Sequence, residues 1–160
     1  MKRIILLVIL VMSTTQLWSQ SMFIYPKKLE SQLCIGLTLG EFRCKCGFAS
    51  CKATIINPLL LSAYKILREK TGHPLTILSG FRCARHNFKV DGADLSQHQL
   101  GSAIDIAISS LEDVGIFKQD AYDSGFVFME YHEDKKFIHL DTRSTQAMCL
   151  EGNSKDGMLH

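Results

Sequence analysis

The sequence lacks a long hydrophobic run and lacks an excess of charge of either sign. The apolar stretch from Ile4 to Met12 is less than half of the roughly 20 residues that cross a bilayer as a helix. Lys2 and Arg3 account for the whole excess of 18 basic over 16 acidic residues. We therefore expect no stable membrane insertion of the folded part, and no nucleic acid or anionic membrane surface as a partner.

The N-terminal residues are typical of a secretory signal peptide. Two basic residues precede the apolar stretch, and the polar segment Ser13 to Ser21 offers small residues for cleavage near Ser19. A buried N-terminal helix or an uncleaved anchor is the alternative. We predict a signal peptide over residues 1–20, a single domain over 21–150 and a polar tail over 151–160. This organisation predicts a secreted or periplasmic protein.

All six cysteines follow this leader. An even number in an exported chain favours disulfides, because the compartment outside the cytoplasm is oxidising. The alternative is a second, structural zinc site in which Cys44, Cys46 and Cys51 are completed by Cys83. We expect disulfides, although the spacing selects no pairing. The six residues are Cys34, Cys44, Cys46, Cys51, Cys83 and Cys149.

The pattern of apolar residues and turn signals predicts an α+β domain with a small, mainly antiparallel sheet flanked by helices. Asn57-Pro58 predicts the start of a helix that ends near Gly72. Ser110 with Asp113 resembles a capping box that opens a second helix to about Asp123. Strands are expected over 75–82, 101–108, 126–130 and 136–143, the last two as a hairpin, with loops over 37–51 and 83–100.

Strand periodicity predicts that three potential metal ligands share one side of the sheet. In the strand after Gly101, which permits tight backbone passage, Asp105 lies on the face opposite the isoleucines. In the last predicted strand, His139 and Asp141 project away from the apolar face. His98 approaches from the loop just before the first of these strands.

Two imidazoles and one carboxylate suit zinc. They form a three-ligand site that leaves a fourth position for water, which is the pattern of a catalytic rather than a structural zinc. An isolated histidine or aspartate is more often structural, so the shared face is the observation that favours a metal site. A zinc ion in such a site lowers the pKa of its bound water and polarises a peptide carbonyl.

Four motifs surround these residues in order: SGFR at 79–82, RHN at 85–87, SQHQLGSAIDI at 96–106 and FIHLD at 137–141. Together they resemble the D-alanyl-D-alanine carboxypeptidase family of zinc peptidases. That family also includes phage endolysin peptidases and D-Ala-D-Ala dipeptidases, and it shares its fold with the hedgehog signalling domain. The similarity extends over about residues 41–143.

The resemblance implies that His98, Asp105 and His139 bind Zn²⁺. It also implies that Arg82 binds a substrate carboxylate or carbonyl, for which a planar set of donors is suited. An ion pair that orders the loop is the alternative role for Arg82. Ser96 is expected to be a polar contact near the metal.

The general base departs from the family pattern. Many relatives have Glu three positions, or His two positions, before the last histidine ligand, where this chain has Lys and Phe. Glu133 in the hairpin turn and Asp141 are the predicted catalytic substitutes. Asp141 is equally suited to orient a ligand from behind. Glu130 and His132 are close by in the sequence.

We therefore predict an exported zinc peptidase that cleaves peptidoglycan stem peptides as a monomer. A D-Ala-D-Ala carboxypeptidase is favoured over an endopeptidase. The first alternative is a non-catalytic, zinc-containing domain that binds cell-wall or protein ligands. The second is a small disulfide-linked binding protein without metal.

Overall fold

The structure is a computed structural model that describes residues 22–28, 32–34, 37–110 and 113–143 of the 160-residue chain. The predicted signal peptide over 1–20, the predicted tail over 151–160 and Cys149 lie outside these residues. No helix within the described ranges is both long enough and apolar enough to span a bilayer.

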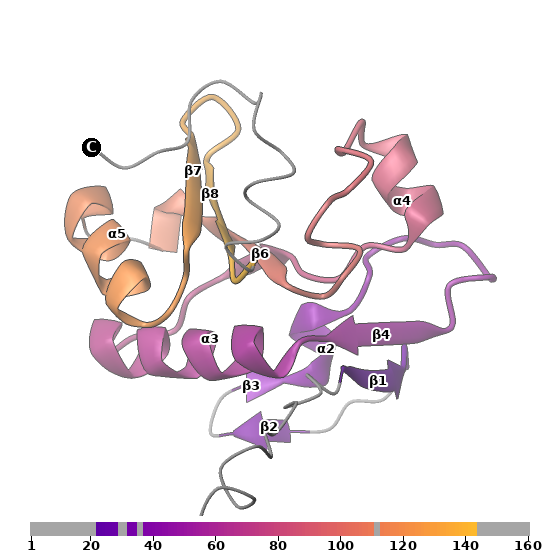
Figure 1. Cartoon of the computed structure of the whole chain (residues 1–160), viewed down its shortest axis with the longest axis horizontal. Helices are drawn as coiled ribbons and strands as arrows, with labels where there is room; N and C mark the ends of the chain where they lie inside the picture. The colour runs from indigo at the N-terminus through magenta and orange to yellow at the C-terminus, as the bar shows by residue number, and fades with distance from the viewer. Residues whose placement is uncertain (1–21, 29–31, 35–36, 111–112, 144–160) are drawn as a thin grey trace, which may run out of the picture.

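An antiparallel sheet of four strands forms the centre of the domain (Figure 1). Each strand pairs antiparallel with its neighbours, and the last two form the predicted hairpin. In spatial order the strands are β5 (Ile77–Ser79), β6 (Ala103–Ala107), β8 (Phe137–Asp141) and β7 (Phe128–His132).

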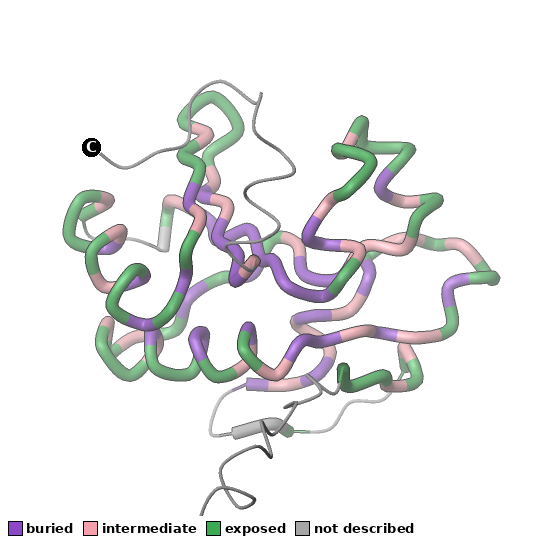
Figure 2. The backbone as a smooth tube through the Cα atoms, in the orientation of Figure 1, coloured by how far each residue is buried: buried purple, intermediate pink, exposed green. Residues whose placement is uncertain are grey.

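Two helices pack against one face of this sheet, α3 (Pro58–Thr71) and α5 (Val114–Asp123). Their apolar faces and those of β6 and β8 form one core cluster, seen as the buried backbone segments in Figure 2. The opposite face of the sheet is therefore the one available for polar chemistry. The fully buried core side chains include Tyr64, Leu67, Ile104, Ile106, Ala121, Ile138 and Leu140.

Helix α3 begins and ends where the sequence predicts. The Asn57 side chain accepts a hydrogen bond from the Leu59 backbone N–H at 2.9 Å, and Pro58 occupies the first helical position. Gly72 ends the helix in the left-handed conformation, with a φ of 69°.

The predicted start of α5 at Ser110 is wrong. Ile108–Ser110 form a short 3-10 helix, η1, and Asp113 is the capping residue. Its carboxylate accepts a hydrogen bond from the Ile116 backbone N–H at 2.9 Å. A carboxylate at this position also interacts favourably with the helix dipole.

The two predicted loops contain further helices. The segment 37–51 includes α2 (Leu39–Phe42), and the segment 83–100 includes α4 (Ala84–Lys89). Two small antiparallel pairs complete the fold. They are β1 (Phe23–Pro26) with β4 (Ala53–Ile56), and β2 (Gln32–Cys34) with β3 (Leu37–Thr38). In Figure 1, β4 leads directly into α3, while β1, β2 and β3 lie below it.

Two glycines allow segments to approach closely beside the sheet. A Cβ on Gly101, whose φ is 65°, would lie 2.3 Å from the Ile55 carbonyl oxygen. A Cβ on Gly80 would lie 2.6 Å from the Phe42 carbonyl oxygen. The predicted tight passage at Gly101 is thus confirmed, and Gly80 brings the end of β5 against α2.

Candidate metal centre

A row of side chains crosses the open face of the main sheet, one from each strand. Glu130 on β7 is directly opposite His139 on β8, and His139 is opposite Asp105 on β6. Asp105 is in turn opposite Ser79 on β5. Because opposed residues of antiparallel strands point to the same face, the pairing places these four polar groups side by side.

His98 reaches this row from the loop before β6. Its Nδ1 lies 2.7 Å from the Gly80 carbonyl oxygen, and its side chain is buried. The carbonyl can only accept, so Nδ1 donates and Nε2 is the nitrogen with the free lone pair in the neutral ring. The His98 carbonyl oxygen accepts a hydrogen bond from the Arg82 backbone N–H at 3.1 Å. This bond holds together the two ends of the segment 83–97.

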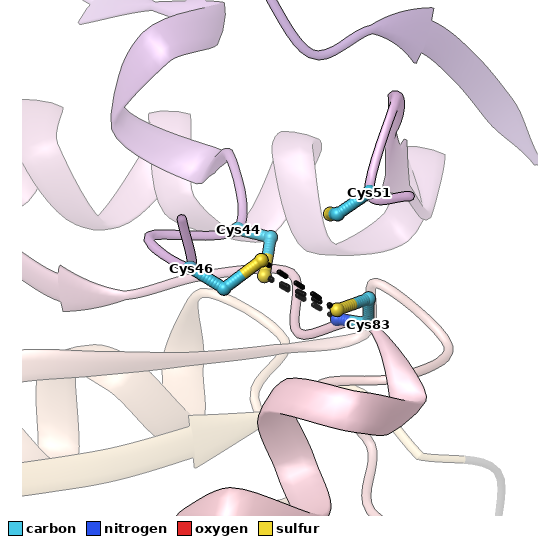
Figure 3. Close-up of side chains that lie close together, drawn as sticks. All are labelled: Cys44, Cys46, Cys51 and Cys83. Atoms are coloured by element: carbon cyan, nitrogen blue, oxygen red, sulfur yellow. Dashed lines mark hydrogen bonds between the residues drawn. The ribbon is translucent and has the colours of Figure 1, made fainter. Parts of the chain in front are cut away.

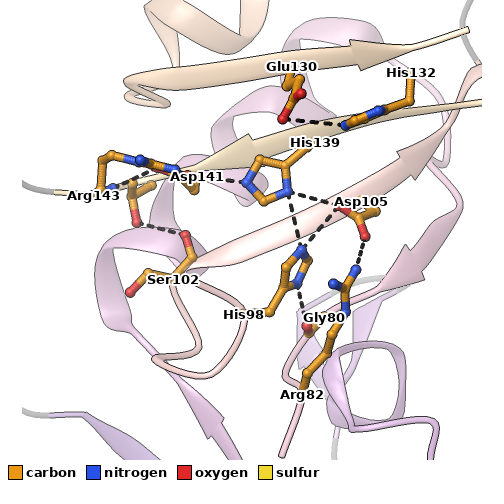
Figure 4. A network of polar contacts seen from close by, with 11 residues as sticks. Gly80, Arg82, His98, Ser102, Asp105, Glu130, His132, His139, Asp141 and Arg143 are labelled. Carbon is orange, nitrogen blue, oxygen red and sulfur yellow. Dashed lines mark hydrogen bonds and ion pairs between the residues drawn. The ribbon is translucent and has the colours of Figure 1, made fainter. Parts of the chain in front are cut away.

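Three ligand atoms converge at the centre of Figure 4. His98 Nε2 lies 3.1 Å from Asp105 Oδ1, and His139 Nδ1 lies 2.9 Å from the same oxygen. The two nitrogens are 3.2 Å apart. Ligand atoms bound at about 2 Å to a tetrahedral zinc are about 3.3 Å from one another, so the triangle fits a single ion.

The chemistry of these atoms also fits a cation. Asp141 Oδ2 lies 3.2 Å from His139 Nε2 and accepts its hydrogen bond, which leaves the His139 Nδ1 lone pair directed at the centre. With both rings neutral, two imidazole lone pairs and one carboxylate oxygen meet at the centre. The structure brings together the three residues predicted from the sequence as ligands.

Asp141 lies behind His139, not beside the open face. Its side chain is fully buried, and Arg143 binds both of its oxygens, with Nε–Oδ1 and Nη2–Oδ2 distances of 2.9 and 2.6 Å. The Arg143 guanidinium in turn stacks on Phe128 at 4.0 Å. This arrangement is that of a carboxylate that orients a histidine ligand. Arg143 was not selected from the sequence, although its spacing of two from Asp141 places both on one strand face.

Arg82 holds the other oxygen of the aspartate ligand. Its Nη2 forms an ion pair with Asp105 Oδ2, and its Nε donates to Ser79 Oγ at 2.8 Å. The alternative role predicted for Arg82, an ordering ion pair, is therefore present in the structure. The guanidinium remains partly accessible, with 16% of the side chain exposed, at the edge of the centre.

The carboxylates control protonation in the metal-free centre. Burial would lower the pKa of His139, but the hydrogen bonds to Asp105 and Asp141 outweigh it and raise this pKa to about 9. Burial would raise the pKa of Asp105, yet the two imidazoles hold it well below its usual range. For His98, burial dominates and lowers the pKa. A proton on His139 therefore occupies the place of a metal ion until one binds.

The structure places the remaining predicted residues, Ser96 and Glu133, in turns. Ser96 is part of the turn before His98, where its carbonyl accepts the Gln99 N–H at 2.9 Å. Glu133 is exposed in the β7–β8 turn, just beyond the last residue of β7. Glu130 is closer to the ligands, since it is opposite His139, and its Oε2 lies 3.4 Å from His132 Nε2. The alternation of β7 is the sequence signal that points Glu130 and His132 to the same face.

A second cluster contains Cys44, Cys46, Cys51 and Cys83, whose sulfurs lie within 4.8 Å of one another (Figure 3). All four are free cysteines. The expected disulfides are not formed among them, and the structure instead has the arrangement of the alternative that the sequence left open.

The sheet and its His-Asp-His centre define a possible metal site, and a sequence comparison identifies a metallopeptidase family. Residues 36–141, more than half of the chain, match the family model of peptidase M15. The chain therefore belongs to this family, and the resemblance to the D-Ala-D-Ala carboxypeptidase-like zinc peptidases is confirmed. No curated protein matches the chain.

Proposed function

We propose that the chain is an exported zinc peptidase that cleaves peptidoglycan stem peptides, preferentially as a D-Ala-D-Ala carboxypeptidase. The observation that supports this most directly is the convergence of His98 Nε2, Asp105 Oδ1 and His139 Nδ1 on an open sheet face. Three ligands leave a further coordination position, as a hydrolytic centre needs.

His98, Asp105 and His139 would hold the zinc ion. When bound there, Zn²⁺ would act as a Lewis acid: it would polarise a peptide carbonyl and lower the pKa of a bound water molecule. The buried Asp141–Arg143 pair keeps His139 in the tautomer and orientation that direct Nδ1 to the centre.

We assign the role of general base to Glu130 in preference to Glu133 and Asp141. Glu130 is on the same face as the ligands and opposite His139, whereas Glu133 lies in the exposed turn. Both oxygens of Asp141 are already bound by Arg143. Glu130 would accept the proton of the attacking water and deliver it to the leaving amine, and His132 beside it would modulate its basicity.

Arg82 favours a carboxypeptidase. Its guanidinium is fixed by Asp105 and Ser79 but is still partly exposed at the rim of the centre. A cation held within reach of the scissile carbonyl can bind the terminal carboxylate of a short peptide. An endopeptidase has no such carboxylate next to the bond that it cleaves.

The test is hydrolysis of purified muropeptides by the zinc-loaded protein, analysed by mass spectrometry. Release of terminal D-alanine from pentapeptide stems is expected, and cleavage of cross-linked stems alone would indicate an endopeptidase. His98→Ala should abolish turnover, and His73→Ala, remote from the centre in the α3–β5 connection, should not. Zinc bound at the centre without turnover of any stem peptide would contradict the enzyme proposal.

A non-catalytic binding domain is the second candidate. The observation that favours it is Lys136, which stands where many relatives have a glutamate base and adopts a positive φ of 59° in the hairpin turn. The same assay separates the two candidates, because a binding domain would retain stem peptides without cleaving them. We further propose a secreted or periplasmic monomer, which gel filtration and cell fractionation would test.

A further inference from the structure

The four-cysteine cluster includes Cys83, which directly follows Arg82, the residue that forms an ion pair with Asp105 of the His-Asp-His centre. Cys44, Cys46 and Cys51 belong to the segment between α2 and β4, and Cys83 immediately precedes α4. Figure 3 shows Cys44 and Cys46 in contact with Cys83, with Cys51 beside them. Residues far apart in the sequence thus bring four sulfurs to one point.

We propose that Cys44, Cys46, Cys51 and Cys83 bind a second, structural Zn²⁺ ion. The Cys83 sulfur lies 3.8 Å from that of Cys44 and 3.7 Å from that of Cys46. Four sulfurs bound at about 2.3 Å to a tetrahedral zinc are about 3.8 Å apart. These two separations match edges of a zinc tetrahedron, and all four sulfurs lie within 4.8 Å of one another.

The surroundings suit a site with four thiolates and a net negative charge. The Cys83 backbone N–H donates to the Cys44 sulfur at 3.4 Å, and the Lys27 ammonium donates to the Cys46 sulfur at 3.5 Å. His86 Nδ1 lies 3.3 Å from the Cys44 sulfur. Such contacts from outside the ligand set orient and stabilise metal-bound sulfurs.

Apolar side chains shield the cluster from water. Cys44 is fully buried, and Cys51 and Phe81 are also buried. Phe48, whose ring lies under the Arg85 guanidinium at 4.0 Å, packs against the same group. A closed site of four protein ligands is structural in type, because no coordination position remains for substrate.

A pair of disulfides explains the arrangement less well. Cys83 is equally close to Cys44 and Cys46, so no single partner is selected. Two disulfides would bring the sulfurs of each pair to about 2 Å, well below the 3.7 and 3.8 Å separations from Cys83. One ion could bind all four sulfurs, which lie within 4.8 Å of one another, and it would release the thiol protons as it binds.

The second zinc ion would help to hold Arg82 in its position beside the His-Asp-His centre. Cys83 follows Arg82 directly in the chain, and the neighbouring Phe81 N–H donates to the Phe42 carbonyl at 2.8 Å. Zinc in the cluster would fasten the segment 44–51 to the residue next to Arg82. Arg82 would then be held from one side by thiolate ligands and from the other by Asp105.

The test is the metal and thiol content of the full chain, purified without chelator from zinc-supplemented cells. Two zinc ions per chain are expected. Cys51→Ser and His98→Ala should each retain one, and the double variant C34S/C149S, which alters the other two cysteines, should retain both. With cobalt in place of zinc, the near-ultraviolet sulfur-to-metal charge-transfer band should be present in His98→Ala and absent from Cys51→Ser.

The wild-type protein provides a test that requires no variant. Its cluster thiols should react slowly with a thiol reagent until a chelator removes the metal. If Cys51→Ser does not fold, Cys51→His, which keeps a zinc ligand, should restore two ions per chain. One zinc ion per chain, together with four cysteines missing from the thiol count, would establish disulfides and overturn the proposal. This result is independent of peptidase activity, because no substrate is used.

Discussion

Glu130 and His139 occupy directly opposed positions on the antiparallel strands β7 and β8. Opposed residues have Cβ atoms about 5 Å apart and share one face of the sheet. A carboxylate is thereby held next to a histidine ligand by the register of a hairpin and not by a sequence motif. In our proposal, Glu130 takes the role of the glutamate that many relatives have three positions before the last ligand, and the hairpin register is what places it there.

Replacing Glu130 should separate metal binding from catalysis. Glu130→Gln should retain zinc at the His-Asp-His centre but lower kcat by about 10²- to 10⁴-fold, the usual contribution of a general base. Glu133→Gln is the matched control and should leave kcat close to that of the wild type. The opposite ranking in steady-state kinetics on a pentapeptide stem would identify the turn residue as the base.

Removing the charge of Asp141 should weaken metal binding. Asp141→Asn takes away the carboxylate that accepts from His139 and binds Arg143, so the zinc affinity should fall about 10- to 100-fold. Competition with a chromogenic chelator measures this change. Asp134→Asn, in the exposed hairpin turn, is the control. An unchanged Kd for Asp141→Asn would contradict the orienting role.

Zinc binding should release a proton from His139. Its pKa in the metal-free protein is raised to about 9, so zinc must displace a proton at neutral pH. The apparent affinity should therefore rise about tenfold per pH unit until about pH 9. Calorimetry in buffers of different ionisation enthalpy should detect about one proton released at this centre, with His98→Ala as the control for zinc bound by thiols. Absence of this release would show that His139 is already neutral.

The same shift affects the stability of the metal-free protein. The folded-state pKa of His139 is raised above the unfolded value of about 6.5, so protonation stabilises the fold. This contribution is fully present below about pH 6.5 and is lost as the pH rises through about 9. Urea unfolding of chelator-treated protein across this range should show the loss, and zinc-loaded protein should not.

Gly101 should be intolerant of a side chain. Gly101→Ala would impose a positive φ of 65° on alanine and place its Cβ 2.3 Å from the Ile55 carbonyl oxygen. The expected loss in the free energy of unfolding is at least about 2 kcal/mol. Gly47→Ala, with open space around the added Cβ, should change it by less than about 0.5 kcal/mol. Equal unfolding midpoints in urea would show that the backbone adjusts at Gly101.

The ligand faces were predictable because strand periodicity is local. Ile104 and Ile106 point to the core and Asp105 to the other side whatever the neighbouring strands are. The helix start at Asn57 was predictable for the same reason, since its cap involves only the next two residues. Such features depend on a few adjacent residues, so the sequence determines them before the fold is known.

Features that depend on contacts between distant parts of the chain could not be predicted from local sequence patterns. The strand predicted to start at residue 126 begins at Phe128, and it extends to His132. Only the pairing of β7 with β8 shows that Glu130 is opposite His139. The convergence of Cys83 with the segment 44–51 likewise depends on the contact between Gly80 and Phe42. The even number of cysteines in the sequence does not indicate which of them lie together in the fold.

The backbone hydrogen bond from the Arg82 N–H to the His98 carbonyl oxygen joins the two ends of the segment 83–97. The positions of both ends are therefore held by this bond and do not depend on the residues between them. Doubling the length of a loop with fixed ends costs only about 0.6 kcal/mol. Within this segment, the buried Asn87 side chain donates to the Ala93 carbonyl oxygen at 2.8 Å, so changes that keep this bond would leave Arg82 and His98 in their places. The exposed surface of this segment can thus vary in sequence without moving the two residues at its ends.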